Sequence, residues 1–219
     1  MNRRSNGFTL IEILVVVSIL AVLMGLVTIL IFKGQKSKGE FLTDTTIQQL
    51  VTAIEGYKRD IENRYPPMSL AELGRIARYK GVVTDANQTN ECCEVLLVAL
   101  RHPDLRSPIG DDLPLGNTDE DNWTQKPDGM PDVLAKEIHD AWGNPIVYFH
   151  KDGYDKPQRI RNFRGEEIEV YAVKKPDGSY YNPVGFQLIS LGEDGVQDTD
   201  YTVPDLVKNR FNFKLEQGN

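Results

Sequence analysis

The sequence predicts an α+β protein in which a long N-terminal helix packs on a small antiparallel sheet. Three observations predict this fold class. Residues 8–32 form an apolar run with a single charge, and the next segment repeats apolar residues at helical spacing. The later part of the chain alternates short strand-like runs with Gly, Pro, Asp and Asn. The 219 residues suffice for one or two domains, and the net charge of -7 argues against nucleic acid as a partner.

The apolar run at residues 8–32 has the length of a membrane-spanning helix. At 1.5 Å per residue it extends roughly 37 Å, and a hydrocarbon core is about 30 Å thick. Arg3 and Arg4 precede it, and lysines follow it. A plain membrane anchor and a secretory signal peptide are the alternatives. The signal peptide is disfavoured because the run is too long and no small-residue cleavage site clearly ends it.

Glu12 is the one charge inside this run. A carboxylate in a spanning helix is costly and needs a partner, and no basic residue lies within the run. Cleavage between Gly7 and Phe8 would supply one, because the new amine of Phe8 is a cation at about the depth of Glu12. The two residues share one face of a helix. Between neighbouring helices, the same pairing would neutralise both charges and set the stagger between subunits.

The hexapeptide GFTLIE at residues 7–12, followed by the apolar run, resembles the class III leader of type IV prepilins. That family includes motility pilins, minor pilins and the pseudopilins of type II secretion. The resemblance implies cleavage after Gly7 by a prepilin peptidase and N-methylation of Phe8. It also implies storage in the inner membrane and assembly through residues 8–32 into a homo-oligomeric filament. Many major pilins carry a proline in this run; here Gly25 is the only weak point.

The resemblance also implies how the chain is divided. Residues 1–7 would be the leader peptide, residues 8–32 the transmembrane and filament-core helix, residues 33–65 the stem helix, and residues 66–219 a periplasmic globular head. Within the stem, the polar stretch 33–39 contains two glycines that mark a candidate hinge. The apolar positions beyond it recur at three- and four-residue steps, which predicts an amphipathic helix that packs on its own domain and ends at Pro66 and Pro67. These positions are Phe41, Ile47, Leu50, Val51, Ile54, Tyr57 and Ile61.

Two further helices are predicted in the head. Ser69 and Glu72 have capping-box spacing, which predicts a short helix over residues 70–80 that Gly81 ends. A third helix is predicted over residues 91–101. It contains the two cysteines, which are adjacent in sequence and are interpreted as small core residues instead of a strained disulfide.

The sheet is predicted from three strand-like runs at residues 146–149, 167–173 and 186–191, joined by short connections. Residues 103–139 are rich in Pro, Gly, Asp and Asn and predict a long surface loop, with a short helix near residues 133–138. The acidic clusters of this loop, at residues 111–112 and 119–121, are interpreted as a solvated face, since they do not meet the EF-hand pattern; a metal role for the loop is the less favoured alternative.

Two segments of the head resemble signatures of major pseudopilins. Residues 140–145, DAWGNP, are similar to an Asp-Pro-Trp-Gly-Asn-Pro element, with Ala141 in place of its proline, and the turn is expected to aim Trp142 back across the core. Residues 190–195, SLGEDG, are similar to the Ser-Leu-Gly-Ala-Asp-Gly element that closes the sheet and opens a calcium loop.

The second signature leads to a calcium hypothesis. The hypothesis is a single Ca²⁺ held by the carboxylates of Asp194, Asp198 and Asp200 and the backbone carbonyls of Leu191 and Ser190. Calcium takes several oxygens from carboxylates and carbonyls alike. The alternative is a solvated acidic turn that uses Asp and Gly for their backbone preferences.

An enzyme is not expected. His102, His139 and His150 have no zinc-site spacing, and the sequence contains no GxSxG, P-loop or GxGxxG motif. The expected function is a structural subunit of a pseudopilus-type filament, assembled from the inner membrane for type II protein secretion. Its expected partners are minor pseudopilins, the prepilin peptidase, an inner-membrane assembly platform and membrane lipid. The alternatives are a type IV pilus subunit and a membrane-tethered periplasmic calcium-dependent binding protein, which would not need Glu12.

Overall fold

The structure is a computed structural model of the chain. It describes residues 10–76, 87–102, 105–106, 108–110, 112–121, 136–198 and 209–215, except for the side chains of residues 26 and 28–37. The chain divides into two compact units, Met1–Gly39 and Glu40–Asn219. We call the second the globular unit. The predicted site residues Gly7, Phe8 and Asp200 lie outside the described residues.

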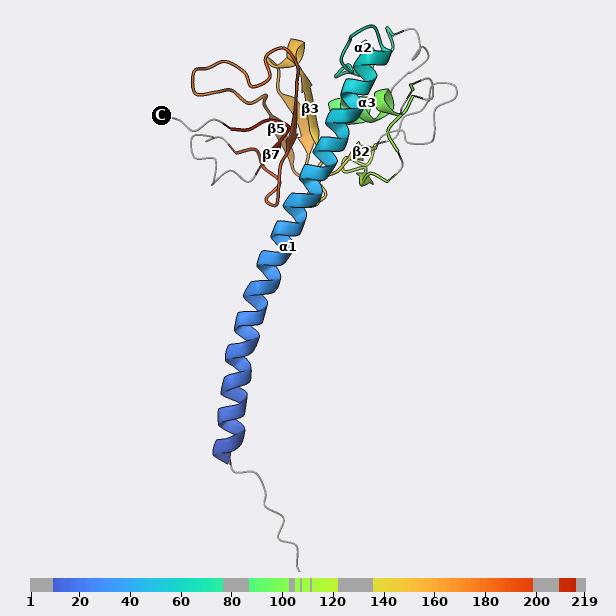
Figure 1. Cartoon of the computed structure of the whole chain (residues 1–219). Coiled ribbons are helices and arrows are strands. Elements are labelled where there is room, and N and C mark those ends of the chain that lie inside the picture. The colour runs from blue at the N-terminus through green and yellow to red at the C-terminus, as the bar shows by residue number, and fades with distance from the viewer. Residues whose placement is uncertain are drawn as a thin grey trace, which may run out of the picture. The chain divides into compact units, whose positions relative to one another are not determined.

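Helix α1 (Leu10–Asp60) begins within the apolar run and includes the polar stretch 33–39, which is helical (Figure 1). In the globular unit its predicted apolar stripe is buried from Ile47 onward, with Ile47, Leu50, Ile54 and Tyr57 at most 1% exposed, whereas Phe41 at its start is 69% exposed. The helix ends earlier than Pro66 because Glu62 and Asn63 adopt positive φ angles of 46° and 62°, a conformation that a right-handed helix does not continue. Among the described residues no helix combines the length and the apolar character needed to cross a membrane. The spanning segment at residues 8–32 stays a prediction.

Two short helices follow. Helix α2 (Leu70–Leu73) has the predicted cap, since the Glu72 amide donates to Ser69 Oγ at 3.3 Å. It is shorter than expected, because the next amides, those of Arg75 and Ile76, donate to the i−3 carbonyls of Glu72 and Leu73 and form turns in place of further α-helix. Helix α3 (Glu91–Leu100) confirms the third predicted helix, and Cys92 and Cys93 within it are buried free thiols.

The described residues form seven short strands and one 3₁₀ turn, η2 (Lys151–Gly153). The strands are β1 (Leu115–Gly116), β2 (Glu137–Ile138), β3 (Val147–His150), β4 (Gln158–Arg161), β5 (Glu167–Val170), β6 (Phe186–Ser190) and β7 (Arg210–Phe211). They pair antiparallel in the orders β1-β2, β3-β6-β7 and β4-β5. The α+β class and the three predicted strands are confirmed, with shifted ends. The single sheet expected of them is wrong, because β5 pairs with β4 in a sheet separate from β3 and β6. The helix expected near residues 133–138 is wrong for residues 137 and 138, which form β2.

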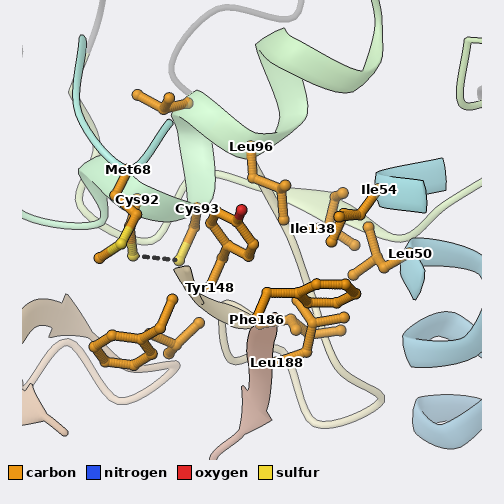
Figure 2. Close-up of a cluster of buried hydrophobic side chains, with 14 of the residues drawn as sticks. Leu50, Ile54, Met68, Cys92, Cys93, Leu96, Ile138, Tyr148, Phe186 and Leu188 are labelled. Atoms are coloured by element: carbon orange, nitrogen blue, oxygen red, sulfur yellow. Dashed lines mark hydrogen bonds between the residues drawn. The ribbon is translucent and has the colours of Figure 1, made fainter. Parts of the chain in front are cut away.

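The core lies where α1, α3 and the β3-β6-β7 sheet meet. Figure 2 shows side chains from all three contributing to one apolar cluster, among them Leu50, Leu96 and Tyr148. Tyr148 is fully buried, and its hydroxyl donates to the Pro66 carbonyl at 2.9 Å, which satisfies the one polar atom of the ring. The expectation for Trp142 is wrong: it is half-buried and stands outside this cluster, because residues 140–143 turn at the end of the sheet.

Candidate assembly segment and candidate calcium loop

The N-terminal part of α1 exposes an almost continuous apolar surface. Thirteen large apolar side chains between residues 10 and 27 are each at least 49% exposed in the single chain. They are Leu10, Ile11, Ile13, Leu14, Val15, Val16, Val17, Ile19, Leu20, Val22, Leu23, Met24 and Val27. Consecutive positions place them on every side of the helix, and a helix that is apolar all round is suited to burial among other helices or in lipid.

The two polar residues described in this segment are accommodated by the helix itself. Glu12 lies in the first turn of α1, where the positive end of the helix dipole favours a carboxylate. The Ser18 hydroxyl donates to the Leu14 carbonyl at 2.8 Å, so it does not disturb an apolar interface. Gly7 and Phe8 lie outside the described part of the chain, and the pairing of Glu12 with the Phe8 amine stays a prediction.

In the globular unit, Asp140 joins the two segments that the sequence singled out. One carboxylate oxygen accepts hydrogen bonds from the Trp142 and Asn144 amides, each at 2.9 Å. The other accepts from Ser190 Oγ at 2.7 Å and from the Gly192 amide at 3.3 Å. Burial raises the pKa of Asp140, and these hydrogen bonds oppose that rise by stabilising the ionised form.

Asn144 strengthens the same junction. Its side-chain amide donates to the Gly192 carbonyl at 2.8 Å, and its side-chain oxygen accepts from the Phe163 amide at 3.2 Å. Gly195 lies beside it with a φ of +70°, and a Cβ there would lie 3.0 Å from the Phe163 ring. The Gly-rich loop after β6 is therefore held in place by side-chain hydrogen bonds from residues 140–163.

The predicted calcium loop contains a side chain that the sequence did not single out. The Asn209 side-chain amide donates to the carbonyls of Leu191 and Val196, at 2.9 and 2.8 Å. Asn209 also exchanges two hydrogen bonds with Asp198, whose amide donates to Asn209 Oδ1 at 2.7 Å and whose Oδ2 accepts from the Asn209 amide at 3.1 Å. Two of the predicted calcium ligands thus hydrogen-bond to Asn209.

The other predicted calcium ligands that the structure describes are Ser190 and Asp194, and the hydrogen bonds described for their side chains involve residues other than Asn209. Ser190 is the last residue of β6, where it pairs with Arg210, and its hydroxyl is bound to Asp140. The Asp194 carboxylate accepts from the Val196 amide at 3.5 Å, in the manner of a local turn. Asp200 lies outside the described residues. The loop can supply oxygen ligands, and the Leu191 carbonyl, which accepts one hydrogen bond from Asn209, keeps a second lone pair for a cation.

Comparison with known proteins identifies the N-terminal segment alone. Residues 2–28 match the family model of the prokaryotic N-terminal methylation motif. No curated protein and no solved structure matches the chain. The chain therefore carries the type IV prepilin-like signal, which points to a structural subunit instead of an enzyme.

Proposed function

We propose that this type IV pilin-like chain is a structural subunit of a pseudopilus-type filament that serves type II protein secretion. The observation that carries the proposal is the position of Glu12 within the methylation motif at residues 2–28, five residues after Gly7. At that spacing, processing after Gly7 creates the cation that a carboxylate in an apolar helix requires.

In this proposal the apolar residues of α1 are the assembly interface. The exposed side chains between residues 10 and 27 would be covered first by inner-membrane lipid and then by the same segment of neighbouring subunits. Van der Waals packing between the helices drives such association, because lipid tails and the neighbouring helices are equally apolar and the hydrophobic effect does not favour one over the other. Glu12 would fix the axial offset between neighbouring subunits, because it can pair with the Phe8 amine of an adjacent subunit only at one stagger.

The remaining partners follow from the same assembly route. A prepilin peptidase would cleave and methylate the chain, and an inner-membrane platform would add subunits to the filament with the globular unit in the periplasm. Minor pseudopilins would complete the filament. A pseudopilus is favoured over a type IV pilus by the segments 140–145 and 190–195, which resemble pseudopilin signatures and which Asp140 joins.

The experiment replaces Glu12 with alanine in the native host and measures incorporation of the subunit into filaments by chemical cross-linking. The Glu12→Ala protein should be made and retained in the membrane but be absent from cross-linked filaments. Glu55→Ala is the matched control, since Glu55 is an exposed carboxylate on the same helix and outside the apolar run. Incorporation of Glu12→Ala at the wild-type level would refute the proposal and favour a tethered binding protein.

A type IV pilus subunit is the second candidate, because the methylation motif at residues 2–28 occurs in both filament classes. Deletion of the chain separates the two. A pseudopilus subunit should be required for export of secreted enzymes and dispensable for twitching motility. The opposite pattern would assign the chain to a type IV pilus.

A further inference from the structure

A buried group of carboxylates lies in the globular unit, away from the predicted calcium loop. Glu94 belongs to α3, Glu137 to β2, and Asp119 to the turn that follows β1. One carboxylate oxygen from each lies within 4.8 Å of the other two. Glu94 and Glu137 are fully buried, and Asp119 is 8% exposed. The acidic cluster 119–121, interpreted from sequence as a solvated face, thus points Asp119 inward.

Asp119 supplies the observation that indicates a ligand. Neither oxygen of its carboxylate is accessible to water, and neither accepts a hydrogen bond from the described residues. The Asn87 side chain favours the ionised form without completing such a bond. A buried carboxylate with two unsatisfied oxygens is costly unless a cation or a proton compensates it.

The cations described near the group, Arg161 and His139, do not neutralise it. The Arg161 guanidinium donates to main-chain carbonyls, those of Gly165 at 3.2 Å and of Asp119 at 3.5 Å. His139 Nε2 lies 3.4 Å from Glu137 Oε2 and so faces only one of the three carboxylates. Asp121 adds a fourth carboxylate close to Glu94, which increases the negative charge.

Burial and repulsion among the carboxylates both disfavour the ionised form of these groups. Burial, and then the nearby carboxylates of Asp121 and Asp119, raise the pKa of Glu94 to about 10. Burial, followed by Asp121 and Glu137, raises the pKa of Asp119 to about 6. A divalent cation among these oxygens would remove most of this repulsion and keep the carboxylates ionised at neutral pH.

Other side chains hold one of the three carboxylates in position. The Asn90 side-chain amide donates to Glu137 Oε1 at 2.6 Å, and the Thr118 amide donates to Glu137 Oε2 at 3.3 Å. Asn90 also accepts from the Arg161 amide at 2.9 Å, which ties the start of α3 to β4. Hydrogen bonds of this kind orient the carboxylate ligands of metal sites.

We propose that Glu94, Asp119 and Glu137 bind a single divalent cation, Ca²⁺, inside the globular unit. Two oxygens bound to one calcium at about 2.4 Å can be no more than about 4.8 Å apart, and these three carboxylates meet that limit. An all-oxygen donor set selects calcium, magnesium or manganese over zinc or copper. Calcium is favoured over magnesium because Mg²⁺ retains several waters, and the side chains of the two glutamates are fully buried.

The cation would act as a cross-link. It would join α3, β2 and the turn 117–120, which come from separate parts of the chain. Calcium is scarce in the cytoplasm. A subunit that binds calcium after export would therefore become more stable outside the cytoplasm than inside it.

The test measures bound metal in the full-length chain, purified in detergent, stripped with EDTA, re-equilibrated with CaCl₂ or MgCl₂ and analysed by mass spectrometry of the elements. Asp119→Asn keeps the shape and removes one ligand charge, and it should weaken binding at least about ten-fold and lower the calcium content by one equivalent. Glu120→Gln is the matched control on the same turn and should bind as the wild type does.

Asp198→Asn distinguishes the buried carboxylate site from the predicted calcium loop at residues 194–200. This variant should keep the calcium equivalent that Asp119→Asn loses. Glu94→Gln, assayed beside Asp119→Asn with circular dichroism to verify folding, should lose the same equivalent. Equal calcium content in Asp119→Asn and the wild type would overturn the proposal. So would a wild-type protein that binds no metal here, the result expected if protons alone compensate the group. Equal affinity for Mg²⁺ would overturn the preference for calcium.

Discussion

At the scale of single residues, Asp140 connects more of the fold than any position the sequence marked. It receives hydrogen bonds from two amides of its own turn and from Ser190 and Gly192, some fifty positions along the chain. Because its side chain is buried, each of these bonds replaces one to water that has been lost on folding. Its carboxylate therefore joins the segment before β3 to the segment after β6, at one end of the sheet.

Replacement of Asp140 with alanine should destabilise the globular unit by about 3 kcal/mol or more, because several buried donors lose one shared acceptor. Urea unfolding of the full-length protein, followed by the change in tryptophan fluorescence or circular dichroism, measures the effect. Asp155→Ala, at an exposed position in the same unit, should change stability by no more than about 0.5 kcal/mol. Similar values for the two variants would contradict the role given to Asp140.

The predicted calcium loop, which Asn209 contacts, can be tested by changing single residues. The loop proposal requires Ca²⁺ at Asp194, Asp198 and Asp200, with the carbonyls of Leu191 and Ser190, and at Leu191 the ion would share the carbonyl oxygen with the Asn209 amide. EGTA should then lower the melting temperature of the Asp119→Asn protein, in which the buried carboxylate site is already weakened. The same addition should have no effect on a protein that also carries Asp198→Asn. If EGTA leaves the melting temperature of the Asp119→Asn protein unchanged, the proposal that the loop binds calcium is contradicted.

At the scale of elements, helices were predicted better than strands. The stripe of α1 and the capping pair of Ser69 and Glu72 are local patterns, and both are present in the structure. Strands β1, β2 and β7 have only two residues each, too few to show a period of two. Strand β4, with the sequence QRIR, carries two arginines and pairs only with β5, so its hydropathy gave no signal.

The candidate metal group shows the same limit for sites. Glu94 falls in a helix whose other positions, Glu91 apart, are apolar, and nothing local distinguishes its buried carboxylate from a solvated one. Glu137 lies 43 positions further along the chain and reaches Glu94 only through the packing of β2 on α3. Sequence reasoning finds ligands at short spacing, as in the loop 194–200, and misses ligands that tertiary contacts assemble.

Helix α1 offers a prediction about its own stability. Gly56 lies within its last turns, and a Cβ there would have only one neighbour within 4 Å, Arg59 Nη2 at 3.8 Å. Gly56→Ala should therefore stabilise the protein by about 0.5–1 kcal/mol, since alanine loses less backbone entropy in a helix. The midpoint of urea unfolding should rise. Gly116→Ala is the contrasting variant, because its Cβ would meet the His139 ring at 1.9 Å, and its midpoint should fall. A lower midpoint for Gly56→Ala would contradict this account of the helix.

At the scale of the whole molecule, the N-terminal segment and the globular unit contribute different kinds of information. The segment carries the methylation motif at residues 2–28 and a surface of exposed apolar side chains. The globular unit has an ordinary buried core, a half-buried Trp142 and two candidate cation sites. Assembly is thus proposed to reside in the first unit, and the identity of the filament in the second.

Processing of the N-terminus is the central claim, because the pairing of Glu12 with a new amine depends on it. The measurement is the intact mass of the protein from a membrane fraction of its native host, with fragmentation of the N-terminus. The account predicts a chain that begins at Phe8 and carries one added methyl group. A chain that still begins at Met1, in cells whose prepilin peptidase processes other substrates, would contradict it and leave Glu12 without the partner on which filament assembly is argued.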